Sequence, residues 1–215
     1  MIETSDVIEA LVADARPVRR LRPPAWRAAL WLLLPALMFG LLTLAHGVRP
    51  DLSQRLHEPG FVFNLVASLL TGVLAAAASF MLNLPDRTRA WALLPVPALI
   101  AWLATLGQGC LTNWVNIGPE GMQLGETARC FATLLVTSLP LALGLFAMLR
   151  HGAVLLPNTL TLTASLAVAA MSATAMLLFH RLDASAMVLI WNLGTAVVIV
   201  ALGSSLGRRV LAPAR

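Results

Sequence analysis

Residues 61–84 read FVFNLVASLLTGVLAAAASFMLNL, and this stretch contains no charged side chain. A helix needs roughly 20 apolar residues to cross a hydrocarbon core of about 30 Å, so the stretch is long enough to span a bilayer. Lipid cannot pair with backbone N–H and C=O groups, and a continuous apolar run of this length is therefore expected to be helical. The stretch predicts an all-α membrane protein rather than a soluble domain.

Similar apolar runs lie on both sides of this stretch. Hydrophobic residues make up 59% of the chain and charged residues 12%, with a mean hydropathy of +0.82, whereas a soluble domain carries roughly 25% charged residues. We predict a polytopic protein of six transmembrane helices, with a cytoplasmic tail at 1–25, a transmembrane domain at 26–207 and a second cytoplasmic tail at 208–215. The predicted spans are 26–44, 61–84, 90–106, 127–149, 154–179 and 186–206.

Arginine placement predicts the orientation, because every basic residue of the chain other than histidine is an arginine. One side of the predicted membrane carries Arg16, Arg19, Arg20, Arg22, Arg27, Arg87, Arg89, Arg150, Arg208, Arg209 and Arg215. The other side carries only Arg49, Arg55, Arg129 and Arg181. The positive-inside rule then places both termini in the cytoplasm. The same rule explains the net charge of +5 without a nucleic-acid partner.

Few side chains offer chemistry inside the predicted spans. Ionisable residues, which mark substrate pathways in membrane proteins, are nearly absent from them. Phosphate loops, paired carboxylates and metalloprotease motifs are also missing from the sequence, and the histidines lie at or beyond the span ends, where they could not hold a haem. We therefore expect no enzyme activity, cofactor or resident metal, and keep a small transporter or channel as the alternative.

The two cysteines lie at the ends of neighbouring predicted spans on the external side. Cys110 ends the third span and Cys130 begins the fourth, in a compartment that permits disulfides. They could form a structural disulfide, stay as free thiols, or act as a redox- or metal-responsive pair, with His180 or Asp183 as a further ligand. A thiol-quinone oxidoreductase is a second alternative, but it needs a closely spaced C-x-x-C pair that the sequence lacks.

The N-terminal tail begins with MIETSDVIEALVADA at 1–15, which predicts a short amphipathic helix from Asp6 to Ala15. Asp6 is the expected N-cap, and Pro17 ends the segment. A bare helix of this length is marginal in water, and its acidic residues do not suit the anionic inner leaflet. We therefore expect it to bind a protein partner, through an apolar stripe of Val7, Ile8, Leu11 and Val12 flanked by Glu9 and Asp14.

Several short segments recur in an order and spacing that resemble one bacterial family. They read PVRRLRPP at 17–24, RPDL at 49–52, LGQGCL at 106–111, RHGA at 150–153 and GRR at 207–209. Together they resemble the NrsF-type family of inner-membrane anti-sigma factors. The resemblance covers essentially the whole chain and implies six spans, with a cytoplasmic N-terminal region that holds an extracytoplasmic-function sigma factor.

The resemblance makes the tail helix the expected sigma-binding element and the bilayer the other partner, with no direct binding of nucleic acid. The sigma factor would be released on an external signal of redox or metal type. One departure concerns the thiols, because family members often carry a cysteine directly after the histidine of the last external loop. Here Arg181 follows His180, so thiol sensing would have to rely on Cys110 and Cys130, together or with His180.

Overall fold

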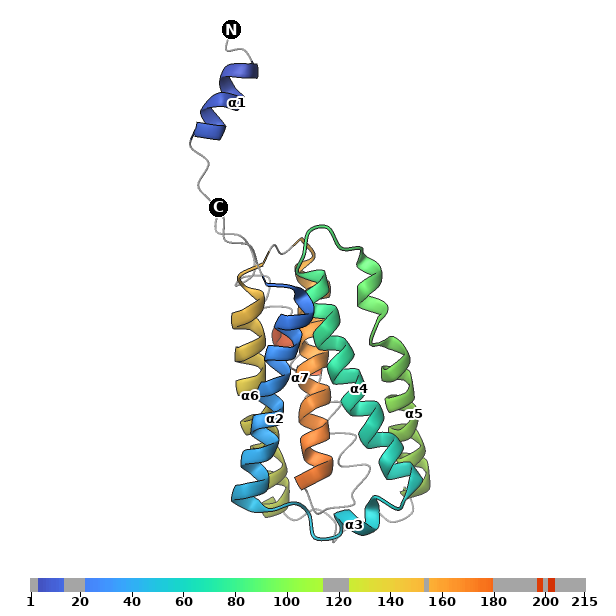
Figure 1. Cartoon of the computed structure of the whole chain (residues 1–215). Helices are drawn as coiled ribbons and strands as arrows, with labels where there is room; N and C mark the ends of the chain where they lie inside the picture. The colour runs from blue at the N-terminus through green and yellow to red at the C-terminus, as the bar shows by residue number, and fades with distance from the viewer. Residues whose placement is uncertain are drawn as a thin grey trace.

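The computed structural model describes residues 4–13, 22–113, 124–152, 155–179, 197–198 and 201–203, and every regular element in these ranges is helical (Figure 1). The predicted all-α fold is confirmed for this part of the chain. The elements are α1 Thr4–Ala13, α2 Pro24–His46, α3 Leu52–Arg55, α4 Pro59–Leu82, η1 Arg89–Leu93, α5 Val96–Asn113, α6 Leu124–Leu149 and α7 Pro157–Phe179.

Three of the helices, α2, α4 and α7, are long and apolar enough to cross a membrane. Each begins with a proline, whose fixed φ suits the first helical position and whose missing N–H would be unpaired there in any case. Gly47, with φ of 71°, ends α2 and donates its N–H to the carbonyl of Thr43. These helices support a membrane association of the chain.

The count of six spans stays a prediction. In α5 and α6 the described side chains give shorter apolar segments, Arg89–Thr105 and Leu135–Leu149. The sixth predicted span, 186–206, lies outside the described residues except for 197–198 and 201–203, which are helical.

Some predicted boundaries were wrong. The third span was expected over 90–106 with a kink at Pro95 and Pro97, and it is divided there into a 3₁₀ turn, η1, and the α-helix α5, which continues past the predicted end to Asn113. Pro95 and Pro97 lie at the division, and a proline cannot donate the backbone hydrogen bond that would continue a helix. The tail helix begins at Thr4 rather than at Asp6, so Asp6 lies in its first turn and is not the N-cap.

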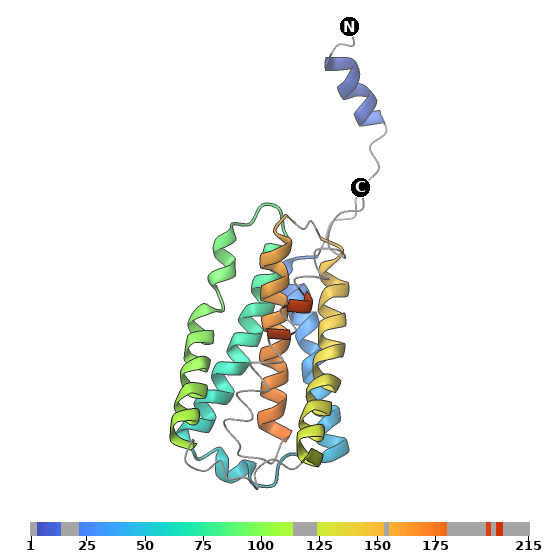
Figure 2. The ribbon, with the colours of Figure 1, turned by 180° about the vertical axis from the view of Figure 1, so that it is seen from behind.

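Helix α7 lies at the centre of the bundle and packs most closely on α4 (Figures 1 and 2). Small side chains let the two backbones approach, and Gly72 of α4 lies directly against the side chain of Met171. Hydroxyl groups join the same pair of helices, because Ser68 Oγ and Thr174 Oγ1 lie 3.0 Å apart. Helix–helix packing of this kind is typical of membrane bundles.

Helices α2, α5 and α7 run from one end of the bundle to the other, and α4 and α6 run in the opposite direction. The tail end holds the start of α2, the ends of α4 and α6, and the start of α7 (Figure 1). The distal end holds the end of α2, the short helix α3, and the end of α7. The described arginines and carboxylates of the bundle lie at these two ends.

Candidate functional site

Three of the four residues predicted for the apolar stripe of the tail have described side chains on α1, and all three are exposed. Val7 is 45% exposed, Ile8 56% and Val12 68%, and Glu9 is also exposed. Leu11 belongs to α1, but its side chain lies outside the described part, as does the whole of Asp14. A short helix with exposed branched apolar side chains has the form of a peptide that docks into a groove of a partner.

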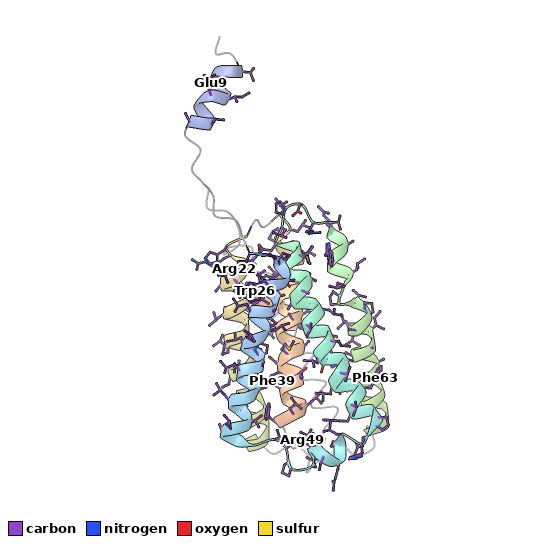
Figure 3. The ribbon with its side chains drawn as sticks, in the orientation of Figure 1. Glu9, Arg22, Trp26, Phe39, Arg49 and Phe63 are labelled. Carbon is purple, nitrogen blue, oxygen red and sulfur yellow. The ribbon has the colours of Figure 1, made fainter. Side chains whose placement is uncertain are left out.

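The two ends of the bundle differ in charge, and Figure 3 labels Arg22 at the tail end and Arg49 at the distal end. Among the described residues, the tail end carries Arg22, Arg27, Arg87, Arg89 and Arg150, with Asp86 as its acidic residue. At the distal end, Arg49 and Arg55 are matched by Asp51 and Glu58. The described arginines that the sequence assigned to opposite sides of the membrane, Arg22, Arg27, Arg87, Arg89 and Arg150 against Arg49 and Arg55, therefore lie at opposite ends of the bundle.

A cluster of buried polar groups lies just inside the tail end, and we call Arg27, Asn83 and the carbonyls of Met148 and Leu149 the polar node. Arg27 Nη2 donates to the Met148 carbonyl at 2.6 Å, and Asn83 Nδ2 donates to the Leu149 carbonyl at 2.7 Å. The last carbonyls of a helix have no partner within it. Arg27 of α2 and Asn83, the residue that follows α4, thus cap the end of α6.

The polar node is buried, so each of its polar atoms needs a hydrogen-bond partner within the protein, unlike those of an exposed helix cap. Arg27 is 6% exposed and Asn83 is fully buried. Arg27 stacks over the ring of Phe80, with Cζ 5.0 Å from the centroid. Arg27 Nη1 and Asn83 Oδ1 are buried without a hydrogen-bond partner among the described residues. The interpretation of Arg27 as an edge residue that only orients the first span was therefore incomplete.

The backbone at Gly152 fits closely against the polar node. A Cβ atom placed on Gly152 would overlap the side-chain amide of Asn83. The Gly152 N–H also donates to the Leu149 carbonyl at 3.1 Å. Only glycine fits at this position without moving Asn83.

An ion-paired cluster fixes the connection between α2 and α4 at the distal end. Arg49 donates to both carboxylate oxygens of Asp51, at 2.8 and 2.6 Å, and Arg55 pairs with Glu58 at 2.9 Å. The Arg49 guanidinium beside Asp51 holds the pKa of that carboxyl well below its usual range. The Arg49 backbone N–H donates to the carbonyl of Leu178 in α7 at 3.2 Å.

The predicted sensing residues are only partly described. The backbones of Cys110 and Cys130 lie in α5 and α6, but their side chains fall outside the described residues, as does all of His180. A disulfide or a metal site therefore stays a prediction. Among the described side chains, no group of three or more His, Cys, Asp or Glu could hold a metal ion.

Sequence reasoning missed the polar node. Asn83 is a single amide at the end of an apolar run, and Arg27 follows Trp26 at the start of another, so each reads as an ordinary boundary residue. An arginine placed inside the apolar run, after the interfacial tryptophan, was the one available signal. Its partner carbonyls carry no sequence signature.

A family model described as NrsF, negative regulator of sigma F, matches residues 11–212 of the chain. The match includes the whole bundle and the last residues of α1. No curated protein and no solved structure matches the chain.

Proposed function

The chain belongs to the NrsF family of negative regulators of a sigma factor, and from that premise we propose that it holds its sigma factor at the bacterial inner membrane through α1. The sigma factor is of the extracytoplasmic-function class, and an external signal releases it. The family is described as one of negative regulators. This favours sequestration over the thiol-quinone oxidoreductase and over the small transporter or channel.

The observation that carries the proposal is the exposed apolar stripe on α1. Val7, Ile8 and Val12 stay exposed on a helix that lies outside the bundle. An isolated helix of ten residues is marginal in water, so it gains stability when the stripe is covered. A groove on a sigma factor would cover it, in the way that amphipathic helices bind other regulatory proteins.

Charge supports the choice of partner. Residues 1–15 contain Glu3, Asp6, Glu9 and Asp14 and no basic residue. Sigma factors use basic surfaces to bind DNA and polymerase, and an acidic helix is complementary to such a surface. In this proposal the stripe supplies the affinity and the carboxylates supply orientation and association rate.

The orientation in the membrane follows from the arginines. The tail end carries the larger share of them among the described residues, and we propose that it faces the cytoplasm, where the sigma factor is. Both termini are then cytoplasmic. The distal end, with its balanced charges and the predicted sites of Cys110 and Cys130, faces the periplasm and receives the signal.

A charge placed on the stripe tests the proposal in cells. Ile8→Asp puts a carboxylate where an apolar contact is expected, so the sigma factor should be released and its target genes should rise without a signal. The measurements are target-gene expression and co-purification of the sigma factor with the solubilised protein.

Ala13→Asp is the matched control, because Ala13 is exposed on the opposite face of the same helix. It adds the same charge and leaves the stripe intact, so repression should persist. The proposal fails if Ile8→Asp represses as well as Ala13→Asp while both are present in the membrane at the wild-type level.

A further inference from the structure

Helix α2, which carries the tail, has little of its surface covered by the bundle. Only 17% of its apolar window is buried, against 72% for α7. Between helices in a membrane there is no hydrophobic driving force, because lipid tails are as apolar as leucine. Polar contacts therefore contribute a large share of what holds α2 in place. One of these contacts joins α2 to α6, because Trp31 Nε1 donates to the Leu141 carbonyl at 3.2 Å.

Buried arginines flank α2 at its two ends, and we call them the arginine clamps. Arg27 lies in the first turn and is 6% exposed, and Arg49 follows the end of the helix and is 5% exposed. Both stack on phenylalanines of α4. The guanidinium carbon of Arg27 lies 5.0 Å from the Phe80 ring centroid, and that of Arg49 lies 5.7 Å from the Phe61 centroid.

Each clamp also bonds to the C-terminal end of another helix. The Arg27 side chain donates to Met148 at the end of α6, and the Arg49 backbone donates to Leu178 at the end of α7. Carbonyls at a helix C-terminus lack intrahelical partners and favour a nearby positive charge. The clamps thus connect α2 to α4, α6 and α7 at points where the polar groups need partners.

Not every polar atom at the tail-end clamp has a hydrogen-bond partner, and this lowers the stability of the buried position of Arg27. Arg27 Nη1 and Asn83 Oδ1 are buried without partners among the described residues. The cost of such buried polar atoms is of the same order as the gain from one charge-assisted hydrogen bond and one cation–π contact. An arginine in the first turn of a membrane helix can also extend to the headgroup region, where water and phosphate satisfy its donors. A released Arg27 would therefore satisfy the donor that has no partner in the buried position.

We propose that Arg27 and Arg49 are positioning residues that set α2 against α4 and α6, and that release of the Arg27 clamp moves the start of α2 and the tail attached to it. A rearrangement at the external end would displace Arg49, the distal clamp, and the resulting movement of α2 would shift the tail. The consequence for regulation rests on the proposed function, because a moved tail matters only if α1 binds the sigma factor.

Two variants disturb the polar node, which includes the Arg27 clamp, from different sides. Arg27→Met removes the charge and the hydrogen bond but keeps the length of the side chain. Gly152→Ala leaves α2 unchanged and displaces Asn83, because its Cβ would overlap the Asn83 amide. Arg27→Lys keeps the positive charge and a donor for Met148. Gly40→Ala is the matched control, since it lies on α2 and its Cβ would meet nothing within 4 Å.

Distances between spin labels report the position of α2 without a sigma factor. In the full chain with its native cysteines replaced by serine, one label pair is placed at Leu37 of α2 and Leu143 of α6, and a second pair at Leu69 of α4 and Leu162 of α7, all of which are exposed. Arg27→Met and Gly152→Ala should lengthen or broaden the first distance and leave the second unchanged. Arg27→Lys and Gly40→Ala should resemble the wild type in both.

Two outcomes would overturn the proposal. The first is an α2–α6 distance unchanged by Arg27→Met and Gly152→Ala. The second is an equal change in both label pairs, because the clamp would then stabilise the whole bundle rather than position α2. Ile8→Asp separates this test from that of the proposed function. It should abolish retention of the sigma factor and leave both distances unchanged, and retention in that variant would count against the proposed function alone.

Discussion

At the scale of single residues, the two buried arginines have different surroundings. Arg49 has a carboxylate partner in Asp51, which is itself partly exposed. Arg27 has a backbone carbonyl and an aromatic ring instead. A buried charge is costly unless it is paired and hydrogen-bonded. The distal group is therefore the more firmly held, and the group at the tail end is the one that can be released.

The Asp51 ion pair predicts a dependence of stability on pH. The pKa of Asp51 is lowered in the folded protein by Arg49, so the folded state binds its proton less readily than the unfolded state does. The stabilising contribution is then fully present above the ordinary carboxyl pKa of about 3.9 and is lost as the pH falls below it. Asp51→Asn should lower the thermal midpoint of the solubilised protein by the same amount at about pH 7 as at about pH 5.5.

The difference between Asp51→Asn and the wild type should shrink as the pH falls from about 4 towards about 2, since the unfolded wild-type chain, whose carboxyl has its ordinary pKa, binds a proton there and is stabilised relative to the folded state. Thermal unfolding followed by circular dichroism at each pH gives the measurement. A difference that is as large at the acid end as at neutral pH would show that the pairing with Arg49 is not the cause.

At the scale of elements, α4 and α7 were each predictable as close-packed helices, but their pairing and the polar contacts of α2 were not. Long apolar runs with clustered small residues predict close-packed membrane helices, because both signals lie within one segment. The division between η1 and α5 depends on Pro95 and Pro97. A proline is known to kink or break a helix, but which of the two occurs depends on the neighbouring chain. Contacts such as Asn83 with Leu149 join a side chain to a distant carbonyl and leave no pattern in the sequence.

Packing, rather than hydrogen bonding, should dominate the stability of the α4–α7 pair. Ser79 Oγ donates to Thr163 Oγ1 at 3.1 Å, and an interhelical hydrogen bond of this kind contributes on the order of 0.6 kcal/mol in a membrane protein. Ala76 is fully buried in the same core, and extra bulk in a packed core costs about 1–3 kcal/mol. Ala76→Leu should therefore lower the free energy of unfolding in bicelles more than Ser79→Ala does.

Ala77→Leu is the control for Ala76→Leu, because the neighbouring Ala77 is only half-buried and has room for part of the larger side chain. Its effect should be smaller than that of Ala76→Leu. A Ser79→Ala variant that loses more stability than Ala76→Leu would indicate that the hydroxyl contacts hold the two helices together.

At the scale of the whole molecule, the chain combines an apolar bundle with a short helix, α1, on which Val7, Ile8 and Val12 are exposed. Three described helices suit a membrane, and the family match assigns the chain to the negative regulators of a sigma factor. Sequence analysis identified this family and the tail helix. It could not predict how the bundle holds the start of α2, because that depends on carbonyls brought together only by folding.

The affinity of the full-length protein for its sigma factor tests the central claim most directly. The partner is the sigma factor that co-purifies with the wild-type chain from membranes of its own host, and the protein is held in lipid nanodiscs. Ile8→Ala should cost on the order of 2 kcal/mol, as expected for an anchor at the centre of a small interface, which raises Kd about thirtyfold. Deletion of residues 2–15 should abolish binding, and a deletion variant that binds as tightly as the wild type would contradict the account.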